Sequence, residues 1–247
     1  MRQSGRNAGV LPGLGGETMS GTLIVVEGLD GSGKTTQMEL LEKSFRDSGT
    51  ACQRVKFPSY DQPFSAPVQM YLNGEFGSKP GDVNAYAASS FFAVDRYASF
   101  RKFWHTNYEN GETILTDRYT TSNLIYQLPK IPRCEWDTFF SWLCDFEFHK
   151  LGIPSPDLTV FLEMPQGISQ RLIDSRYQKN GGKRDIHESD TPYLSSCRKS
   201  ARYAAERLGW HIVSCAENGT PRSIGDIHND IVKIIQEAIP GRSHGLF

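Results

Sequence analysis

A glycine-rich stretch that ends in a lysine and a threonine carries the clearest chemistry in the sequence. It is Gly28-Leu29-Asp30-Gly31-Ser32-Gly33-Lys34-Thr35, and it matches G-x-x-x-x-G-K-[ST] at every fixed position. Such a loop curls until its backbone N–H groups and the positive end of the next helix hold a phosphate. Lys34 would reach the β- and γ-phosphates of ATP, and the Thr35 hydroxyl would bind Mg²⁺. The alternative is a glycine turn between a core strand and a helix, with Lys34 in solvent.

The segments on either side of this loop have the patterns that a phosphate-binding loop needs. The apolar run 22–27 is rich in β-branched residues, which favours a buried strand. From 35 to about 45 the residues favour a helix with its apolar side chains on one face. We therefore expect the ATP cofactor here. The predicted cofactor-binding residues are Gly28, Asp30, Gly31, Ser32, Gly33, Lys34, Thr35 and Thr36.

A carboxylate and a guanidinium follow each other at the end of another predicted strand, 112–117. Asp117 would hold Mg²⁺, directly or through water, beside Thr35, and Arg118 would clamp a phosphate with two hydrogen bonds. The alternative is an ion pair at a strand end. Asp30 would face the phosphates, where a carboxylate needs a metal, a sugar hydroxyl or a cation as its partner. Asp is otherwise an ordinary turn residue.

An aromatic ring and a guanidinium lie close together on a predicted long helix, 83–104, which Asp82 is expected to cap. Phe92 and Arg96 are four residues apart and share a helix face, beside Phe91 and Asp95. A ring and a guanidinium so placed can stack on a base and bind its edge. The alternative is a core aromatic next to a surface arginine.

A polar segment with Gly181-Gly182 at its centre, 177–190, is predicted to be a mobile loop. A basic, glycine-hinged segment beyond a strand end can act as a lid that excludes water and brings cations to a phosphoryl group. A charge run is otherwise a solvated face. We expect His187 to make hydrogen bonds within the loop rather than bind a metal. The basic residues around the glycines are Arg171, Arg176, Lys179, Lys183 and Arg184.

Five predicted strands alternate with helices, which indicates an α/β fold. The strands are short and continuously apolar, so they favour a parallel sheet covered on both faces. Ligands of such sheets bind beyond the carboxyl ends of the strands, which predicts one site for the glycine loop and Asp117-Arg118. We expect a single domain, 19–247, after a disordered extension, 1–18, in front of Met19. The predicted strands are 22–27, 51–57, 112–117, 158–162 and 210–214.

Composition excludes several classes of protein. The formal net charge of −1 gives no field for nucleic acid or an anionic membrane. No apolar run approaches the roughly 18 residues of a membrane span. The five cysteines are odd in number and form no C-x-x-C pair, which favours free thiols in the cytoplasm over a disulfide framework or a zinc site.

Taken in order, these segments resemble the thymidylate kinase family. Residues 27–37 resemble its E-G-x-D-G-x-G-K-[ST]-T motif, and Phe57-Pro58 and the stretch from Phe92 to Arg96 follow. Next come D-R-Y-x-x-S-N-x-x-Y-Q at 117–127 and Pro156-Asp157 before the fourth strand. The resemblance implies a P-loop kinase with a five-stranded three-layer sandwich and a lid, often a homodimer. It also implies transfer of the γ-phosphoryl group of ATP to dTMP, which yields dTDP and ADP.

The resemblance also implies roles for residues around the acceptor. Phe92 would stack on thymine, Arg96 would bind its edge, and Arg118 would hold the dTMP phosphate. Tyr126 would crowd a ribose 2′-hydroxyl, and Asp30 would lie near the dTMP sugar and phosphate. The predicted substrate-binding residues are Asp30, Phe57, Tyr60, Phe92, Arg96, Arg118, Ser122, Asn123 and Tyr126. The predicted catalytic residues are Lys34, Arg118, Lys183 and Arg184, and the predicted metal-binding residues are Thr35 and Asp117.

Some residues depart from the family pattern. Ser59 stands where many relatives have an arginine that contacts the acceptor phosphate, so Lys56 or a lid cation would have to compensate. Ser32 in the loop is not basic, which gives weight to the lid cations. Two other functions stay open: a related kinase for another nucleotide or a deoxynucleoside, and a non-catalytic nucleotide-binding protein. A GTPase switch is disfavoured, because the sequence lacks N-K-x-D.

Overall fold

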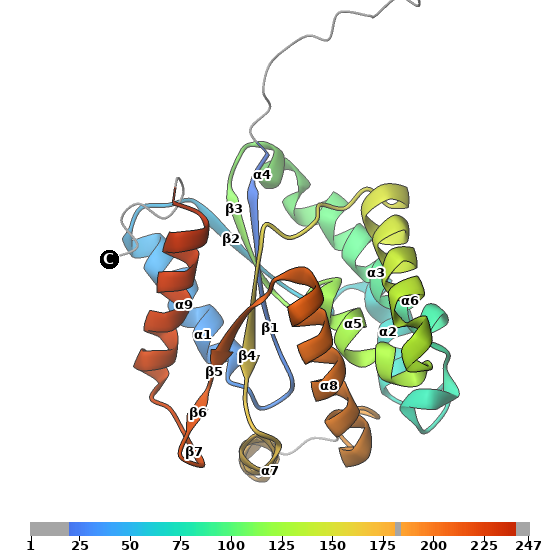
Figure 1. The fold of residues 1–247 in the computed structure, drawn as a ribbon. Coiled ribbons are helices and arrows are strands. Elements are labelled where there is room, and N and C mark those ends of the chain that lie inside the picture. Colours follow the sequence, from blue (N-terminus) through green and yellow to red (C-terminus); the bar gives the residue numbers. More distant parts are fainter. Residues whose placement is uncertain (1–19, 181–183, 241–247) are drawn as a thin grey trace, which may run out of the picture.

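The computed structural model describes residues 20–180 and 184–240, and five of its strands form one parallel sheet. The sheet order is β2-β3-β1-β4-β5 (Figure 1), and the predicted five-stranded parallel sheet is confirmed. β1 is central, with Val26 opposite Asp117 on one side and Val160 on the other. The strands are β1 Thr22–Gly28, β2 Cys52–Lys56, β3 Thr113–Asp117, β4 Leu158–Glu163 and β5 His211–Ser214.

Helices cover both faces of this sheet. On one face, α1 (Lys34–Asp47) and α9 (Ile224–Ala238) pack side by side over a core of aliphatic side chains from the strands (Figure 1). The other face carries a more aromatic core. Within the described residues, no helix has the length and apolar character needed to cross a membrane. The helices over the aromatic core include α3 Ala85–Ser99, α5 Thr121–Tyr126, α6 Trp136–Cys144 and α8 Thr191–Leu208.

Shorter elements complete the fold around the ends of the sheet. α7 lies across the carboxyl end of the sheet (Figure 1). Two π-turns prolong α3 and α6, and a small hairpin precedes α9. These elements are α2 Ala66–Leu72, α4 His105–Glu109, α7 Gln166–Asn180, the π-turns Phe100–Trp104 and Asp145–Lys150, and the hairpin strands β6 Ala216–Glu217 and β7 Thr220–Pro221.

The structure corrects two predicted boundaries. The long helix begins at Ala85 rather than at 83, and its cap is Asn84, whose side-chain oxygen accepts the Ala87 N–H at 2.8 Å. Asp82 instead accepts the N–H of Lys79 in a preceding turn. The loop predicted from 177 starts later, because α7 continues to Asn180. The predicted extension 1–18 and the lid glycines lie outside the described residues.

Candidate active site

The glycine-rich loop joins the central strand to α1 with its backbone in conformations that favour glycine. Gly31 and Gly33 have φ angles of 76° and 88°. A Cβ at Gly31 would lie 2.6 Å from the Ser169 carbonyl oxygen, so this position also needs a residue without a side chain. α1 begins directly after Gly33 with no side-chain cap and no acidic residue in its first turn. Its first N–H groups therefore face the loop as donors for an anion.

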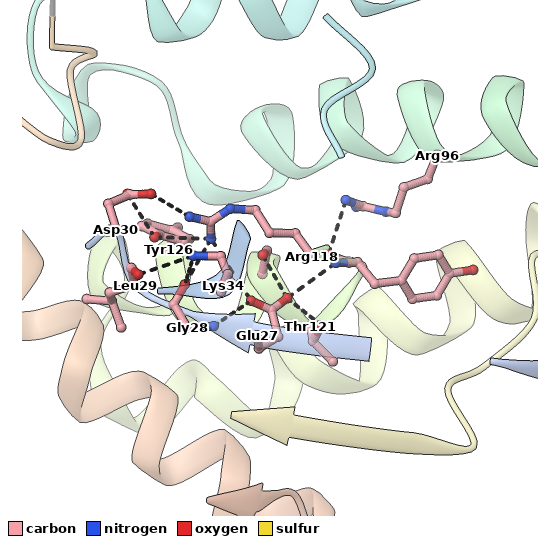
Figure 2. Close-up of polar contacts among 11 residues, drawn as sticks. Glu27, Gly28, Leu29, Asp30, Lys34, Arg96, Arg118, Thr121 and Tyr126 are labelled. Carbon is pink, nitrogen blue, oxygen red and sulfur yellow. Dashed lines mark hydrogen bonds and ion pairs between the residues drawn. The ribbon is translucent and has the colours of Figure 1, made fainter. Parts of the chain in front are cut away.

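Lys34 is held inside this loop. Its ammonium donates to the carbonyl oxygens of Gly28 at 2.8 Å and Leu29 at 3.2 Å, and the side chain is buried (Figure 2). Burial and the charge of Arg118 lower the pKa of Lys34 to about 8. The cation therefore stands beside the glycine loop at the donor side of the site, where a phosphate-binding loop needs positive charge.

A cavity of about 530 Å³ opens beside the loop, and we call it the donor cavity. The glycine-loop residues 30–37 and Asp117 line one side, and a mainly apolar wall faces them. The buried Ser32 Oγ has no hydrogen-bond partner in the described structure. Phosphate donors on one side and apolar side chains on the other suit a nucleotide. The residues of the far wall are Met164, Leu172, Pro221, Arg222, Ile224 and Ile227.

Within the described residues, no group of three or more His, Cys, Asp or Glu side chains could hold a metal ion by itself. Thr35 and Asp117 both line the donor cavity. Mg²⁺ in nucleotide sites takes one or two protein ligands and keeps waters and phosphate oxygens for the rest. The two residues therefore fit Mg²⁺ that arrives with a nucleotide, and do not fit a resident metal centre.

Glu27 is a fully buried carboxylate at the end of β1 that the sequence did not mark as functional. It accepts the hydroxyls of Thr121 at 2.7 Å and Ser122 at 2.8 Å, and the Tyr119 N–H at 3.3 Å (Figure 2). These bonds tie α5 and the turn after β3 to the base of the glycine loop. The Ser122 hydroxyl, predicted to contact the substrate, is a donor to Glu27.

Asp30, Arg118 and Tyr126 form a connected cluster beside Lys34. The guanidinium of Arg118 donates to Asp30 Oδ1 at 2.6 Å and to the Gly28 carbonyl oxygen at 3.3 Å (Figure 2). The Tyr126 hydroxyl donates to Asp30 Oδ2 at 3.2 Å and accepts from Arg118 at 3.2 Å. Burial alone would raise the pKa of Asp30, but the charges of Arg118 and Lys34 outweigh it and lower the pKa to about 2. Asp30 is thus ionised, and Arg118 is its cation.

A second cavity of about 370 Å³, which we call the acceptor cavity, lies on the other side of this cluster. All nine predicted substrate-binding residues line it, and they come from the loops after β1 and β2, from α3 and from the segment after β3. Asp185, His187 and Glu188 of the segment after α7 line it as well. Asp30, Lys56 and Arg118 line both cavities. The acceptor cavity therefore meets the donor cavity at these three residues.

Arg96 has a partner that sequence reasoning missed. Its guanidinium makes two hydrogen bonds of 2.6 Å with the carboxylate of Glu147, and both side chains are almost completely buried. Asn123 also donates to Glu147, at 3.2 Å. The neighbouring Asp95 accepts the Ser59 N–H at 3.1 and 3.2 Å, which holds the loop after β2 against α3.

Of the two predicted catalytic cations of the lid, Lys183 and Arg184, only Arg184 lies within the described residues. Lys183 and the side chains of Arg176 and Lys179 lie outside the described residues. Arg184 pairs with Asp174 and lies over the Tyr177 ring, and it lines neither cavity. In the described part of the lid, acidic side chains and His187 face the acceptor cavity.

Comparisons with known proteins agree with this architecture. The model of one protein family, described as thymidylate kinase, matches residues 26–231. Thymidylate kinase from Mycobacterium tuberculosis is 32% identical over 191 residues, which cover 76% of this chain and 87% of that protein. The solved structure of thymidylate kinase from Candida albicans matches with a TM-score of 0.64 at 23% identity, over 88% of this chain and 92% of that one. At this identity, the structural match concerns the fold.

Proposed function

The chain belongs to the thymidylate kinase family, and on this premise we propose which residues carry out the phosphorylation of dTMP. A nucleoside monophosphate kinase must hold two nucleotides with their phosphates end to end. The observation that carries the proposal is the pair of cavities that meet at Asp30, Lys56 and Arg118. One cavity has a phosphate-binding loop, and the other has the aromatic and polar lining of a nucleoside site.

ATP is the proposed donor, in the donor cavity. Its phosphates would bind the N–H groups of the glycine loop and Lys34, and its base would pack against apolar residues such as Met164 and Ile224. Thr35 and Asp117 would hold Mg²⁺, which neutralises charge that develops on the phosphates.

dTMP is the substrate proposed for the acceptor cavity. Phe92 would stack on thymine, and Arg96 and Asn123 would present hydrogen-bond donors to its edge. Phe57, Tyr60 and Ser122 complete the wall. The Tyr126 ring is fixed by the bonds of its hydroxyl to Asp30 and Arg118, which supports its role as a barrier against a ribose 2′-hydroxyl.

The phosphoryl group would pass between the cavities beside three cations. Lys34 lines the donor cavity, whereas Arg118 and Lys56 line both. Transfer of a phosphoryl group needs alignment and positive charge rather than a covalent intermediate. Lys183 and Arg184 stay proposed as lid cations that join this group.

We also propose a homodimer in the cytoplasm. Val94 and Tyr97 are exposed apolar residues three apart on α3, which supports a second copy of the chain packing there. All five cysteines are free, which is typical of a reducing compartment. Sedimentation equilibrium of the purified chain tests the dimer.

Release of ADP from Mg-ATP with dTMP, dUMP, dCMP, dGMP or UMP tests the function. We expect ADP to be released much faster with dTMP than with UMP, because UMP carries a 2′-hydroxyl and lacks the methyl group of thymine. A preference for another acceptor would indicate a related kinase. Binding of ATP without turnover on any acceptor would indicate a non-catalytic nucleotide-binding protein.

A further inference from the structure

His187 occupies an unusual place for a loop residue. It follows α7 in the lid segment, yet its side chain is buried and lines the acceptor cavity. Its ring stacks on the Tyr126 ring, with centroids 5.2 Å apart and planes only 10° from parallel. Tyr126 is hydrogen-bonded to Asp30 and Arg118. The stacked ring of Tyr126 therefore connects His187 to the cluster between the two cavities.

Two residues from other elements hold this imidazole. The Tyr71 hydroxyl of α2 lies 2.8 Å from His187 Nε2. The Lys130 ammonium, after α5, donates to the same hydroxyl at 2.7 Å and to the Val83 carbonyl oxygen at 3.1 Å. Tyr71 is fully buried, so these are strong contacts in a region of low dielectric.

The charges of Lys130 and His187 determine which group donates and which accepts in this chain of hydrogen bonds. Burial and the nearby Lys130 lower the pKa of His187 to about 3, so the imidazole is neutral. Burial lowers the pKa of Lys130 to about 7, and in its protonated form the ammonium can only donate, so Tyr71 then accepts from it and uses its own proton for His187 Nε2. The order of donors is therefore Lys130 to Tyr71 to His187.

Hydrogen bonds also fix the backbone around His187. The Ile186 N–H donates to the Leu72 carbonyl oxygen of α2 at 3.2 Å. Asp185 Oδ1 accepts the N–H groups of His187 and Glu188, each at 2.8 Å. Tyr193, which follows this segment, donates its hydroxyl to the Tyr126 carbonyl oxygen. The segment is thus bound to α2 and to α5, the two sides of the acceptor cavity.

We propose that His187 is a positioning residue for the acceptor: held by Tyr71 and Lys130, it fixes the Tyr126 ring that lines the acceptor cavity, so that binding of the acceptor nucleotide depends on it. The inference rests on the proposed function of the acceptor cavity. Buried polar groups cost stability compared with apolar packing, and these three line or adjoin the cavity rather than the centre of the core. The consequence is that binding and discrimination of the acceptor depend on His187, and binding of ATP does not.

The test compares three variants in steady-state assays with dTMP, UMP and ATP. His187→Ala loses the stack and the hydrogen bond, His187→Phe keeps an aromatic ring, and Tyr71→Phe loses only the hydroxyl. We expect His187→Ala to raise KM for dTMP about tenfold or more and to reduce the preference for dTMP over UMP by a similar factor. Both other variants should show smaller changes of the same kind, and KM for ATP should stay within about twofold of wild type.

His228→Ala is the matched control. This α9 histidine also lies within hydrogen-bond distance of a hydroxyl on another helix, Ser44 Oγ at 3.1 Å, but it lines neither cavity. The inference is overturned if His187→Ala keeps KM for dTMP and the preference over UMP, or if KM for dTMP and ATP rise together as in a general loss of structure. If His187→Ala does not fold, Tyr71→Phe decides by the same measurements. Turnover of dTMP by the wild-type chain is a separate result, and its absence would refute the proposed function instead.

Discussion

Arg96 and Glu147 face each other in a parallel pair, with Nε to Oε2 and Nη2 to Oε1 both at 2.6 Å. The pair joins α3 to the π-turn after α6, two elements that are far apart in the sequence. The third nitrogen, Nη1, lies 3.4 Å from the Tyr119 carbonyl oxygen. Glu147 therefore fixes the orientation in which the guanidinium lines the acceptor cavity.

Replacing Glu147 by Gln is expected to destabilise the protein strongly. The change leaves the buried Arg96 charge without its counter-charge, and loss of one partner of a buried pair costs about 3 kcal/mol or more. Urea unfolding measures this loss, and KM for dTMP should rise with it. Glu163→Gln is the control, because its partner Arg202 is largely exposed to solvent and the loss of this pair should cost less than about 1 kcal/mol. Equal losses in both variants would contradict the prediction.

Lys34→Ala is expected to remove most turnover while the fold survives. Within residues 20–180 and 184–240, the side chain bonds only to the carbonyl oxygens of Gly28 and Leu29, so its loss leaves no carboxylate there without its hydrogen-bond partner. Without this cation, kcat should fall by about 10³-fold, because loss of one electrostatic contact to a transition state typically lowers kcat by about this factor. Steady-state kinetics and a thermal melt measure the two effects. Lys43→Ala, an exposed lysine of the same helix, should leave kcat unchanged. A kcat near wild type in Lys34→Ala would refute the assigned role.

Lys56→Met tests the cation between the two cavities. Lys56 ends β2 beside Asp117, and in the described part of the chain its ammonium makes no ion pair. We expect kcat/KM for dTMP to fall about 10²-fold, whereas stability should hardly change because the side chain is exposed. Lys56→Arg keeps the charge and should retain most activity. If the Met variant matches wild type, the cation at this position is not used.

Asp185→Asn is expected to change how stability depends on pH. Burial and the charge of Asp30 raise the pKa of Asp185 from 3.8 to about 7. A carboxyl with a raised pKa in the folded state contributes stability that is present below pH 4 and is lost as pH rises towards 7. Asn offers the same oxygen to the His187 and Glu188 N–H groups without ionising. The variant should therefore gain on the order of 2 kcal/mol over wild type at pH 8 and little at pH 4.

Urea unfolding at the two pH values measures this difference. Asp190→Asn is the control, because Asp190 caps α8 by accepting the Tyr193 N–H, and Asn caps helices equally well. This variant should not show the gain in stability at pH 8. If the free energy of unfolding of Asp185→Asn differs from that of wild type by the same amount at pH 4 and pH 8, ionisation of the Asp185 carboxyl does not cost stability.

Local patterns were sufficient to predict the sheet, whereas most residues expected around the acceptor came from the resemblance to the thymidylate kinase family. The glycine loop is defined by consecutive residues, and parallel strands bring their carboxyl ends to one edge, so Arg118 had to lie near Lys34. The partner of Arg96 could not be found in this way. Glu147 lies in an aromatic helical segment where an acidic residue ordinarily suggests a surface position, and no spacing rule connects it to α3.

The sequence carries a local signal for the hairpin beside the donor cavity. Asn218-Gly219 stands between β6 and β7, both residues have positive φ, and Asn-Gly is the usual turn of a two-residue hairpin. This hairpin brings Arg222 to the cavity rim, where it donates to the Ser214 carbonyl oxygen. The strands have only two residues each, so alternation of apolar residues could not reveal them.

The position of β1 in the sheet has a consequence for synthesis on the ribosome. The strand emerges first, but Thr22 pairs with Thr113 and Ile24 with Leu158. One edge of this apolar segment stays without its partner until β3 has emerged and the other until β4 has emerged, and pairing across such separations is slow and exposed to aggregation. The glycine loop therefore gains its support late in translation, and a nascent chain that stops before β4 cannot build the phosphate site.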